Sequence, residues 1–482
     1  MENLEVKLEE TREYYKSGKT KEASWRFSQL KGLHKFLNQN QQQIYNALFQ
    51  DLGKHHVEAF RDEIGNLQMS LNFALENLKH WMSPKKAKLP AIAVLNSAEV
   101  VPEPLGVVLV ISSWNFPFGL SLEPLIGAIA AGNCVFLKTS EFSPASSAFL
   151  AKVIGDYVDK KAVRVVEGGA ATGERLLQLR WEKIFFTGED ERVGRIVMAA
   201  AVKYLTPVTL ELGGKCPAIV DSLSCSWDIE STAQRIVVGK FGACAGQACI
   251  AIDYILVEHK FISTLVELLK KYIKKFFDKG SNEAKNMARI VNKQNFLRLK
   301  NMVDEPAVQA TIIYGGSMDE DKLFVEPTIL LNPPNDAEIM REEIFGPILP
   351  IIGMDKIEDS IDFINSRAKP LAIYAFTKDK AFQRRLVSET TSGSLTFNDA
   401  IIQYAVDTLP FGGVGESGIG RYHGKFSFDT FSHEKAVVKR SFLIDFWFRY
   451  PPWNNHKLEL LRHAYNFNYF QLVLTVLGLK RS

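Results

Sequence analysis

The sequence predicts an α/β protein made of two doubly wound parallel-sheet domains and a small β arm. A chain of 482 residues is longer than the ~250–300 at which single hydrophobic cores stop growing, so more than one compact unit is expected. Short β-branched runs alternate with helix-like stretches, as in parallel sheets that are covered on both faces. Hydrophobic residues make up 46% and charged residues 23%, which excludes a disordered or fibrous chain.

The first ninety residues carry the periodicity of helices, as the spacing of Trp25, Leu30, Leu33 and Phe36 illustrates. Four short runs then predict the strands of a first, Rossmann-like sheet: residues 107–111, 134–137, 163–166 and 183–186. A second series predicts the strands of a second sheet: residues 207–210, 312–314, 348–352 and 373–376.

An alternating, Pro-flanked segment at residues 91–103 predicts a β arm that leaves the first domain. An edge ribbon of this kind suits subunit pairing, so we expect a homodimer. The predicted organisation is a first domain at 1–85 and 105–208, a second at 209–396, an oligomerisation or bridging segment at 86–104 and 397–440, and a tail at 441–482.

Charge and cysteine usage exclude several functions. Lysine and arginine number 58 against 55 acidic residues, so no net field is available to hold nucleic acid. The five cysteines are an odd number without a Cys-x-x-Cys pair, which predicts free thiols in a reducing compartment. The first residues show neither a secretory nor an organellar signal, so the cytoplasm is expected.

Three short motifs nearly match known ligand sites, and each fails on context. Residues 413–418 fit Gly-x-Gly-x-x-Gly, but no predicted strand precedes them, so a turn-forming loop is the better interpretation. Residues 18–20 read Gly-Lys-Thr, like the end of a P-loop, but Glu13 occupies the position where a P-loop has its first glycine. His55 and His56 lack the spacing of metal ligands, and we predict no metal site.

The most informative segment is residues 241–250, which read FGACAGQACI around Cys244 and Cys249. Small residues beside Cys249 allow a carbonyl group to approach the sulfur and leave backbone N–H groups free to face an oxyanion. Taken alone, the segment favours a buried structural cysteine over a reactive one, since free cysteines are among the most buried residues. The segment ELGGK at residues 211–215 precedes it and places Glu211 near two glycines.

Together these motifs resemble the aldehyde dehydrogenase superfamily. ELGGK and GQAC occur in the family's order with WNFP at residues 114–117 and EEIFGP at 342–347. The resemblance extends from about residue 51 to residue 418, and the segment YHGK at 422–425 with FSH at 431–433 is similar to the class 3 branch, particularly its plant members.

The resemblance implies catalytic roles for three residues. Cys249 would attack the aldehyde as a thiolate, assisted by a nearby base or a positive field because an ordinary thiol is largely protonated at neutral pH. Asn115 and the backbone N–H of Cys249 would hold the oxyanion, and Glu211 would activate water. The alternatives are a solvated strand-end charge for Glu211 and a turn residue for Asn115.

The resemblance also implies an NAD(P)-binding first domain and a catalytic second domain. Lys138 and Glu141 would bind the adenosine ribose, and an ionised Glu141 favours NAD over NADP, although class 3 enzymes can use both. The acidic run at residues 189–191 departs from the family's pyrophosphate loop and is unfavourable beside phosphate. The other expected cofactor-binding residues are Gly168, Thr187, Gly188, Glu189, Val193, Leu212, Glu343 and Phe345.

Substrate and tail are less constrained by the sequence. Trp114, Phe118, Phe397 and Ile401 would line an apolar funnel for aromatic or medium-to-long aliphatic aldehydes, although each also reads as a core residue. After Ser441 the chain is aromatic and basic. An amphipathic helix there would pack on a partner subunit, the favoured interpretation, or lie at the cytoplasmic face of a membrane as a peripheral contact. Its apolar positions are Leu460, Leu461, Tyr469, Phe470, Leu472, Val473 and Val476.

Two other functional classes remain open at this stage. A nucleotide-independent thiol esterase would use Cys249 without redox chemistry. A catalytically silent dimeric or membrane-associated binding protein would use neither the thiol nor the cofactor.

Overall fold

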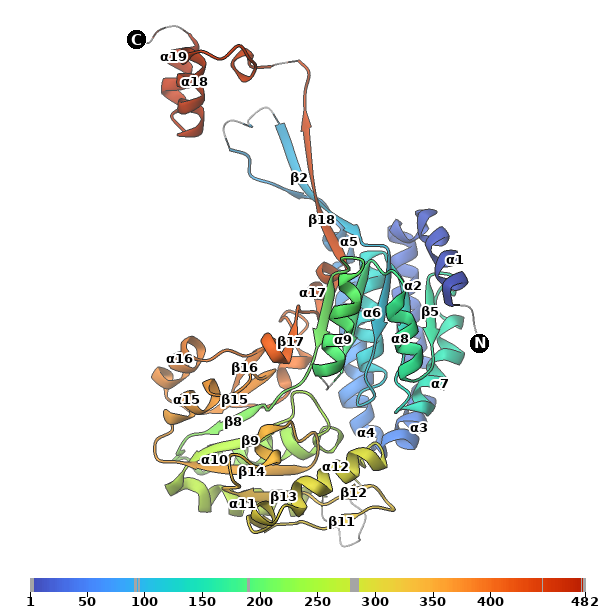
Figure 1. The fold of residues 1–482 in the computed structure, drawn as a ribbon, viewed down its shortest axis with the longest axis vertical. Helices are drawn as coiled ribbons and strands as arrows, with labels where there is room; N and C mark the ends of the chain where they lie inside the picture. Colours follow the sequence, from blue (N-terminus) through green and yellow to red (C-terminus); the bar gives the residue numbers. More distant parts are fainter. Residues whose placement is uncertain are drawn as a thin grey trace. The chain divides into compact units, whose positions relative to one another are not determined.

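The computed structural model describes residues 4–90, 93, 96–188, 191–277, 286–443, 445–477 and 479 (Figure 1). The chain divides into two units. The first comprises Met1–Leu78 and Pro104–Phe431, and the second comprises Lys79–Glu103 and Ser432–Ser482. The mixed α/β fold with parallel sheets confirms the predicted fold class.

The predicted helical beginning of the chain is confirmed. Leu30, Leu33 and Phe36 are almost completely buried on one face of their helix, as the 3.6-residue periodicity requires. Gly53 takes a φ of 66°, which favours glycine and ends the third helix. The helices are α1 (Leu4–Lys16), α2 (Ala23–Gln39), α3 (Gln41–Leu52), α4 (His56–Ala59) and α5 (Gly65–Met82), with the π-helical turn η2 (Phe60–Ile64) between α4 and α5.

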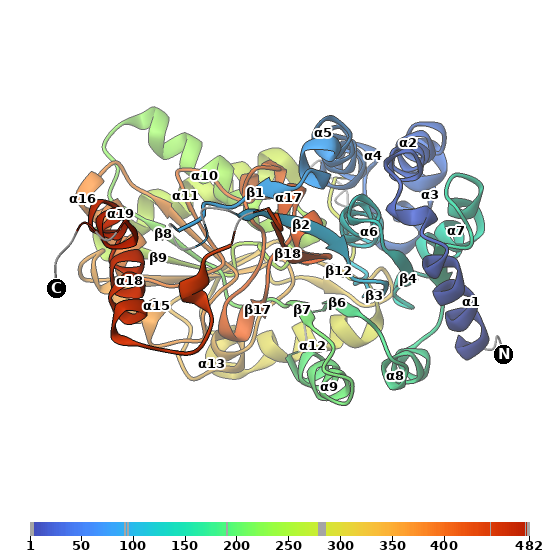
Figure 2. The ribbon, with the colours of Figure 1, turned by 90° about the horizontal axis from the view of Figure 1, so that it is seen from above.

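The first sheet has six strands in the order β17-β7-β6-β3-β4-β5, and all neighbours are parallel except β17 and β7. Figure 2 shows α8 and α9 on one face of this sheet and α6 with the N-terminal helices on the other. The strands are β3 (Val107–Ile111), β4 (Cys134–Lys138), β5 (Val163–Val166), β6 (Lys183–Thr187), β7 (Val208–Glu211) and β17 (Gly418–Ile419). The helices are α6 (Gly119–Ala131), α7 (Pro144–Val153), α8 (Ala170–Gln178) and α9 (Glu191–Val202).

Two sequence-based boundaries differ from the observed fold. Residues 207–210 were expected in the second sheet, but β7 pairs in parallel with β6 and belongs to the first. The chain changes sheets after β7, where Gly214 has a φ of 138°. Part of the expected bridging segment also belongs to the first unit, because β17 pairs with β7 and α17 (Gly424–Thr430) packs on α6.

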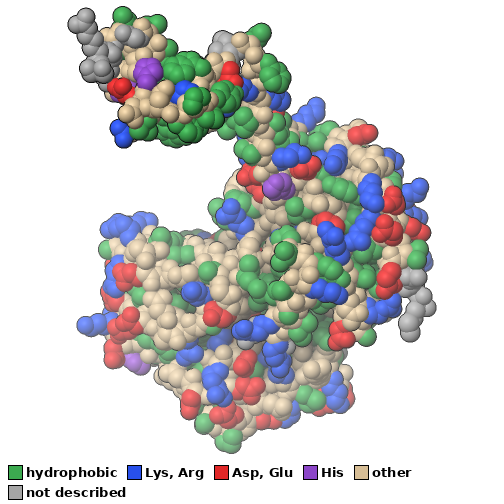
Figure 3. Space-filling view, turned by 45° about the horizontal axis from the view of Figure 1, so that its top comes forward, with side chains coloured by type: hydrophobic (Ala, Val, Ile, Leu, Met, Phe, Trp, Pro, Cys, Tyr) green, Lys and Arg blue, Asp and Glu red, His purple; other side chains and the backbone are tan. Residues whose placement is uncertain are grey.

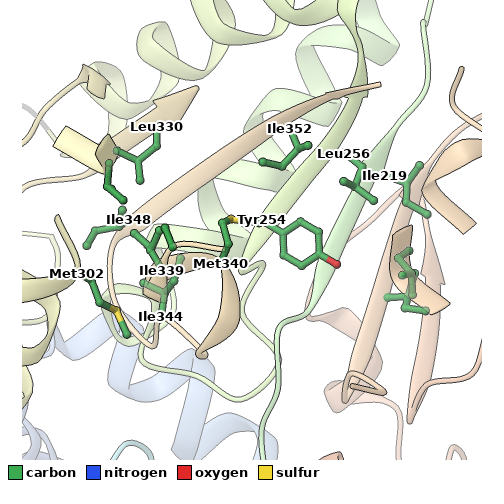
Figure 4. Close-up of a cluster of buried hydrophobic side chains, with 14 of the residues drawn as sticks. Ile219, Tyr254, Leu256, Met302, Leu330, Ile339, Met340, Ile344, Ile348 and Ile352 are labelled. Atoms are coloured by element: carbon green, nitrogen blue, oxygen red, sulfur yellow. The ribbon is translucent and has the colours of Figure 1, made fainter. Parts of the chain in front are cut away.

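The second sheet has seven strands in the order β10-β13-β14-β9-β8-β15-β16, parallel except for β10 with β13. Its core contains Ile219, Tyr254, Leu256 and Ile348, all at most 1% exposed (Figure 4). The strands are β8 (Pro217–Val220), β9 (Tyr254–Glu258), β10 (Ile312–Tyr314), β13 (Thr328–Leu331), β14 (Ile348–Met354), β15 (Ala372–Phe376) and β16 (Ser394–Phe397).

The helices of this region are α10 (Ser226–Phe241), α11 (Ile262–Phe277), α12 (Lys293–Asp304), α13 (Pro306–Gln309), α14 (Glu338–Arg341), α15 (Asp359–Asn365) and α16 (Lys380–Glu389). A small hairpin pairs β11 (Met318–Asp319) with β12 (Phe324–Val325).

The second unit contains a three-stranded sheet in the order β1-β2-β18 and two C-terminal helices. Its strands are β1 (Lys85–Lys86), β2 (Asn96–Pro104) and β18 (Ser432–Arg440), and its helices are α18 (Asn455–Tyr465) and α19 (Tyr469–Val476). The expected single tail helix is therefore two, because Phe467 has a φ of 56° and Asn468 caps a new helix.

Many apolar side chains of the tail are exposed, among them Phe442, Leu443 and Phe470. Figure 3 shows hydrophobic side chains gathered on the lobe that carries the C-terminal helices. Among the described residues, every helix is too short or too polar to cross a bilayer.

Candidate active site

Cys249 lies in a loop that follows α10 and the short 3-10 turn η5 (Cys244–Gly246). Cys244, Ala245 and Gly246 all have positive φ values, of 50°, 53° and 78°, so the backbone of this loop is unusually curved. A Cβ on Gly246 would lie 2.6 Å from the carbonyl oxygen of Gly346, which leaves room only for glycine. Cys249 itself is half-buried and reaches the surface of a cavity.

Two buried polar side chains, Glu58 and Gln247, fix this loop. Glu58 accepts a hydrogen bond from the backbone N–H of Cys244 at 2.8 Å. The side chain of Gln247 donates to the carbonyl oxygens of Cys244 and Arg289 and accepts from the N–H of Val291. Because these groups are buried, releasing any of them would leave an unsatisfied polar atom, so the loop conformation is strongly determined.

Asn115 is held beside the same loop. Its side-chain amide nitrogen donates to the carbonyl oxygen of Gln247 at 3.0 Å, and its Oδ1 is buried without a hydrogen-bond partner among the described residues. Its own carbonyl oxygen accepts from Lys54 Nζ at 2.8 Å. Lys54 also pairs with Glu63 at 2.7 Å, and both side chains are fully buried. The other carboxylate oxygen of Glu63 accepts from the N–H groups of Phe118 and Gly119 and so anchors the start of α6.

Glu211 is the last residue of β7 and is 2% exposed. Neither carboxyl oxygen has a hydrogen-bond partner among the described residues. Burial raises the pKa of Glu211 well above its ordinary value. The alternative of a solvated strand-end charge is therefore wrong.

The environment of the Cys249 thiol differs from the expectation of a nearby positive field. Burial raises the pKa of Cys249, and the negative charges of Glu343 and Glu211 raise it further. The charged groups that act on this thiol are thus negative, so they do not supply the expected positive field, and help from a nearby base stays a prediction. Thiolate formation in this site requires a positive charge from a bound group or proton transfer to a base.

The cavity beside Cys249 has a volume of about 280 Å³ and is mainly apolar. The polar side chains of Arg61, Asp62, Asn66 and Asp399 also line it. Arg61 and Asp62 belong to the π-helical turn η2, and π-helical turns occur frequently at functional sites. The apolar lining comes from Phe116, Leu120, Val238, Ala243, Ala248, Ile250, Ala400, Ile401, Ile402, Ala405 and Phe411, with the ring of Tyr404.

Of the four predicted substrate residues, Ile401 lines this cavity and the other three occupy packed positions. Trp114 is 4% exposed and its ring meets that of Phe345 edge-on at 5.6 Å. Phe118 is completely buried, and Phe397 packs against the core of the second sheet. Their placement reflects the ambiguity noted for apolar residues, since core packing and substrate contact require the same side chains. Phe116, between Trp114 and Phe118, is the residue of this segment that reaches the cavity.

The family of the chain follows from a match to the family model described as "Aldehyde dehydrogenase family", which covers residues 2–437. The chain belongs to the aldehyde dehydrogenase family. It is accordingly an oxidoreductase that acts on aldehydes with NAD or NADP. The predicted resemblance to this family is thereby confirmed.

The relatives of this aldehyde dehydrogenase place it in the class 3 branch. It is 56% identical to "Aldehyde dehydrogenase family 3 member F1" of Arabidopsis thaliana, covering 100% of this chain and 99% of the relative. It is 49% identical to "Aldehyde dehydrogenase family 3 member H1" of the same plant, covering 98% and 96%. The fold is similar to that in the structure "Substrate bound state of Staphylococcus Aureus AldH", with a TM-score of 0.92 and 39% identity over 96% of this chain and 100% of that chain.

Several predicted cofactor residues of the dehydrogenase lie at the carboxyl ends of parallel strands, where nucleotides bind in open α/β sheets. Lys138 ends β4 and forms an ion pair with Glu141 at 2.7 Å. Gly168 follows β5 with a φ of 135°, and Thr187 ends β6. The Thr187 hydroxyl is buried without a hydrogen-bond partner among the described residues, so it is available to a ligand.

The remaining predicted cofactor residues divide between two loops. A Cβ on Gly213 would lie 2.1 Å from Glu343 Oε2, so the loop that follows Leu212 directly contacts Glu343. Val193 is 40% exposed on α9, near the predicted pyrophosphate position of Gly188. Phe345 takes a positive φ of 51°. Glu189 and Asp190 lie outside the described residues, as does the side chain of Glu191.

A buried ion pair that the sequence did not reveal joins these loops. Lys215 pairs with Asp253 and donates to the carbonyl oxygens of Ile339 and Glu342. Asp253 also accepts from the N–H of Ile344 at 3.0 Å. The loop that carries Glu343 is thus fixed to the loop that follows Glu211. Lys215 belongs to the ELGGK motif, but the motif does not predict that Asp253 is its ion-pair partner.

Proposed function

We propose that this dehydrogenase oxidises aromatic or medium-to-long aliphatic aldehydes to carboxylic acids through a thioester on Cys249. The proposal rests on the position of Cys249 at the apolar cavity, beside a loop held by Asn115. The carboxyl group of Glu211 is close enough to affect the pKa of the thiol. A nucleophile, an oxyanion donor and a base are therefore available at one site.

The first half of the reaction uses Cys249 and Asn115. The thiolate sulfur forms a bond to the aldehyde carbon, and the carbonyl electrons move onto the oxygen. The Asn115 amide and the backbone N–H of Cys249 donate hydrogen bonds to that oxygen, and such a donor is worth ~3–4 kcal/mol. Collapse of the oxyanion expels a hydride and leaves a thioester on sulfur.

Bound NAD(P) supplies the hydride acceptor and, when oxidised, a positive ring charge that favours the thiolate of Cys249. Lys138 and Glu141 bind the adenosine ribose, and the ionised carboxylate of Glu141 disfavours a 2′-phosphate, so NAD is preferred. The remaining cradle consists of Gly168, Thr187, Gly188, Glu189, Val193, Leu212, Glu343 and Phe345.

The second half of the reaction uses Glu211. Its carboxylate accepts a proton from water as the water oxygen attacks the thioester carbon, the carbon–sulfur bond breaks, and the free acid leaves. A base buried without hydrogen-bond partners binds this proton more readily than an exposed glutamate does, because its pKa is raised.

The test measures absorbance of reduced nicotinamide with a panel of aldehydes, using NAD and NADP separately. Wild-type enzyme should show a rise with apolar aldehydes, and Cys249→Ala should show none while still binding NAD in calorimetry. Ester hydrolysis that is independent of nucleotide, with no aldehyde oxidation, would instead support the thiol esterase. Failure to bind either cofactor would support a silent binding protein.

We further propose that the second unit pairs two copies of the chain into a homodimer. The exposed apolar residues Phe442, Leu443, Trp453 and Phe470 support this, because an apolar surface of this kind is rarely left uncovered in solution. The full chain of 54.2 kDa should therefore have twice its mass by light scattering, and a chain that ends at Ser441 should show a weakened dimer.

Peripheral membrane contact in the cytoplasm is the competing use of the same surface. Flotation of the full chain with liposomes, but not of the chain that ends at Ser441, would favour the membrane. A monomer that ignores liposomes would contradict both uses.

A further inference from the structure

A second group of ionisable side chains, two of them buried and one half-buried, lies where α6, α17 and the loop after η7 (Ile402–Ala405) meet. Glu123 projects from α6, Asp407 lies in the loop, and His423 directly precedes α17. One donor atom from each side chain lies within 4.8 Å of the other two. Glu123 is 3% exposed and His423 is 2% exposed, so bulk water does not solvate these charges.

The orientation of the imidazole is set by its second nitrogen. His423 Nε2 lies 2.8 Å from the carbonyl oxygen of Tyr404, and a carbonyl can only accept, so Nε2 carries the hydrogen. Nδ1 therefore directs its lone pair toward Asp407 Oδ1 at 3.5 Å and Glu123 Oε1 at 3.8 Å. Nδ1 is buried without a hydrogen-bond partner among the described residues.

The three donor atoms thus lie within 4.8 Å of one another. Ser70 Oγ donates to Asp407 Oδ1 at 2.8 Å, which fixes that carboxylate. No lysine or arginine in the described ranges forms an ion pair with Glu123 or Asp407. Two carboxyl groups this close to each other repel when both are ionised. A positive charge between the two carboxylates would remove this electrostatic cost.

We propose that Glu123, Asp407 and His423 bind one divalent cation of the Zn²⁺ or Mn²⁺ type. Donors bound tetrahedrally at ~2.1 Å are about 3.4 Å apart, close to the two distances from Nδ1. One imidazole with two carboxylates suits these cations better than Ca²⁺, which takes six to eight oxygen donors. Histidines that bind metals usually donate their other ring N–H to a carbonyl or carboxylate, as His423 does to Tyr404.

The proposed metal site is connected to the substrate cavity through Tyr404. Tyr404 lines that cavity together with Cys249, and the carbonyl oxygen of Tyr404 accepts a hydrogen bond from His423. A cation on Nδ1 polarises the imidazole and strengthens the hydrogen bond from Nε2. Ile401, Ile402, Tyr404 and Ala405, which line the cavity, are then positioned by a metal that does not touch the substrate.

The test titrates the full-length enzyme, after chelator treatment and dialysis, with ZnCl₂ and with MnCl₂ in a calorimeter. Thermal denaturation is followed in parallel. Wild-type enzyme should bind one equivalent of at least one of these cations and unfold at a higher temperature with it. Asp407→Asn and Glu123→Gln preserve side-chain shape, so each should fold and weaken binding at least tenfold.

A matched control removes a histidine from a surface pair. His463 lies 3.5 Å from Glu459 on α18, and His463→Gln should leave cation binding unchanged. Absence of stoichiometric binding in the wild type would overturn the proposal. Equal affinity in wild type, Asp407→Asn and Glu123→Gln would also overturn it, because the cation would then bind elsewhere.

Discussion

Replacing Glu211 by glutamine separates the two halves of the proposed reaction. Glutamine has nearly the same shape, and neither oxygen of Glu211 has a partner to lose among the described residues. It cannot accept the proton from water, and a positioned general base typically contributes 10²–10⁴-fold. Steady-state turnover should therefore fall by that factor, while formation of the thioester continues.

The assay follows the absorbance of reduced nicotinamide by stopped flow. The enzyme concentration is high enough that one equivalent of product per active site gives a signal well above the background absorbance. Glu211→Gln should release about one equivalent of reduced cofactor per active site in a rapid burst and then almost stop. Turnover at the wild-type rate would refute Glu211 as the base. A missing burst would refute its restriction to the second half-reaction and would indicate that Glu211 also deprotonates Cys249.

Glu211→Gln should also change how the unfolding free energy depends on pH, in a direction that the burial of Glu211 determines. Because burial raises the pKa of Glu211, the unfolded chain loses this proton at lower pH than the folded chain does. As pH rises from the ordinary pKa toward the folded one, wild type loses about 1.4 kcal/mol of unfolding free energy per pH unit from this group. Glutamine lacks this loss, so the advantage of Glu211→Gln in thermal denaturation should widen as the pH rises above the ordinary pKa of glutamate. A constant or reversed difference would contradict the assigned burial effect.

Three other substitutions test the surrounding structure. Lys54→Met leaves Glu63 as an unpaired buried charge and should lower the unfolding free energy by about 3–5 kcal/mol in urea titrations, whereas a loss below 1 kcal/mol would show that the pair is not desolvated. Asn115→Ala should reduce kcat by about 10²–10³ with little change in NAD affinity, and an unchanged kcat would exclude its amide as oxyanion donor. Gly213→Ala places a methyl group 2.1 Å from Glu343 Oε2 and should raise the KM for NAD more than that for aldehyde; equal effects would indicate general disruption of the loop.

The sequence predicted those parts of the fold that depend on local pattern. The spacing of Leu30, Leu33 and Phe36 is a property of one helix, and the β-branched runs at β3 and β4 are properties of single strands. The sheet to which β7 belongs depends on pairing with β6, which no local pattern specifies. The expected boundary therefore fell inside a strand of the first sheet.

A similar limit applies to the site. Cys249, Glu211 and Asn115 stand in motifs that can be recognised directly in the sequence. The support for these residues comes from long-range contacts instead. Glu58, which accepts a hydrogen bond from the N–H of Cys244, lies 186 residues away in the sequence, so no local pattern could predict its role.

In the π-helical turn at Phe60–Ile64, the number of residues determines where the side chains point, in addition to which residues they are. An α-helix advances about 100° per residue, so the wide turn rotates everything after it relative to an uninterrupted helix. In the observed phase, Asp62 faces the cavity while the adjacent Glu63 reaches Lys54. Deleting one residue here would return the stretch to a regular α-helix and turn both carboxylates away from their positions. The active site would then be disturbed although Cys249, Glu211 and Asn115 would all be unchanged.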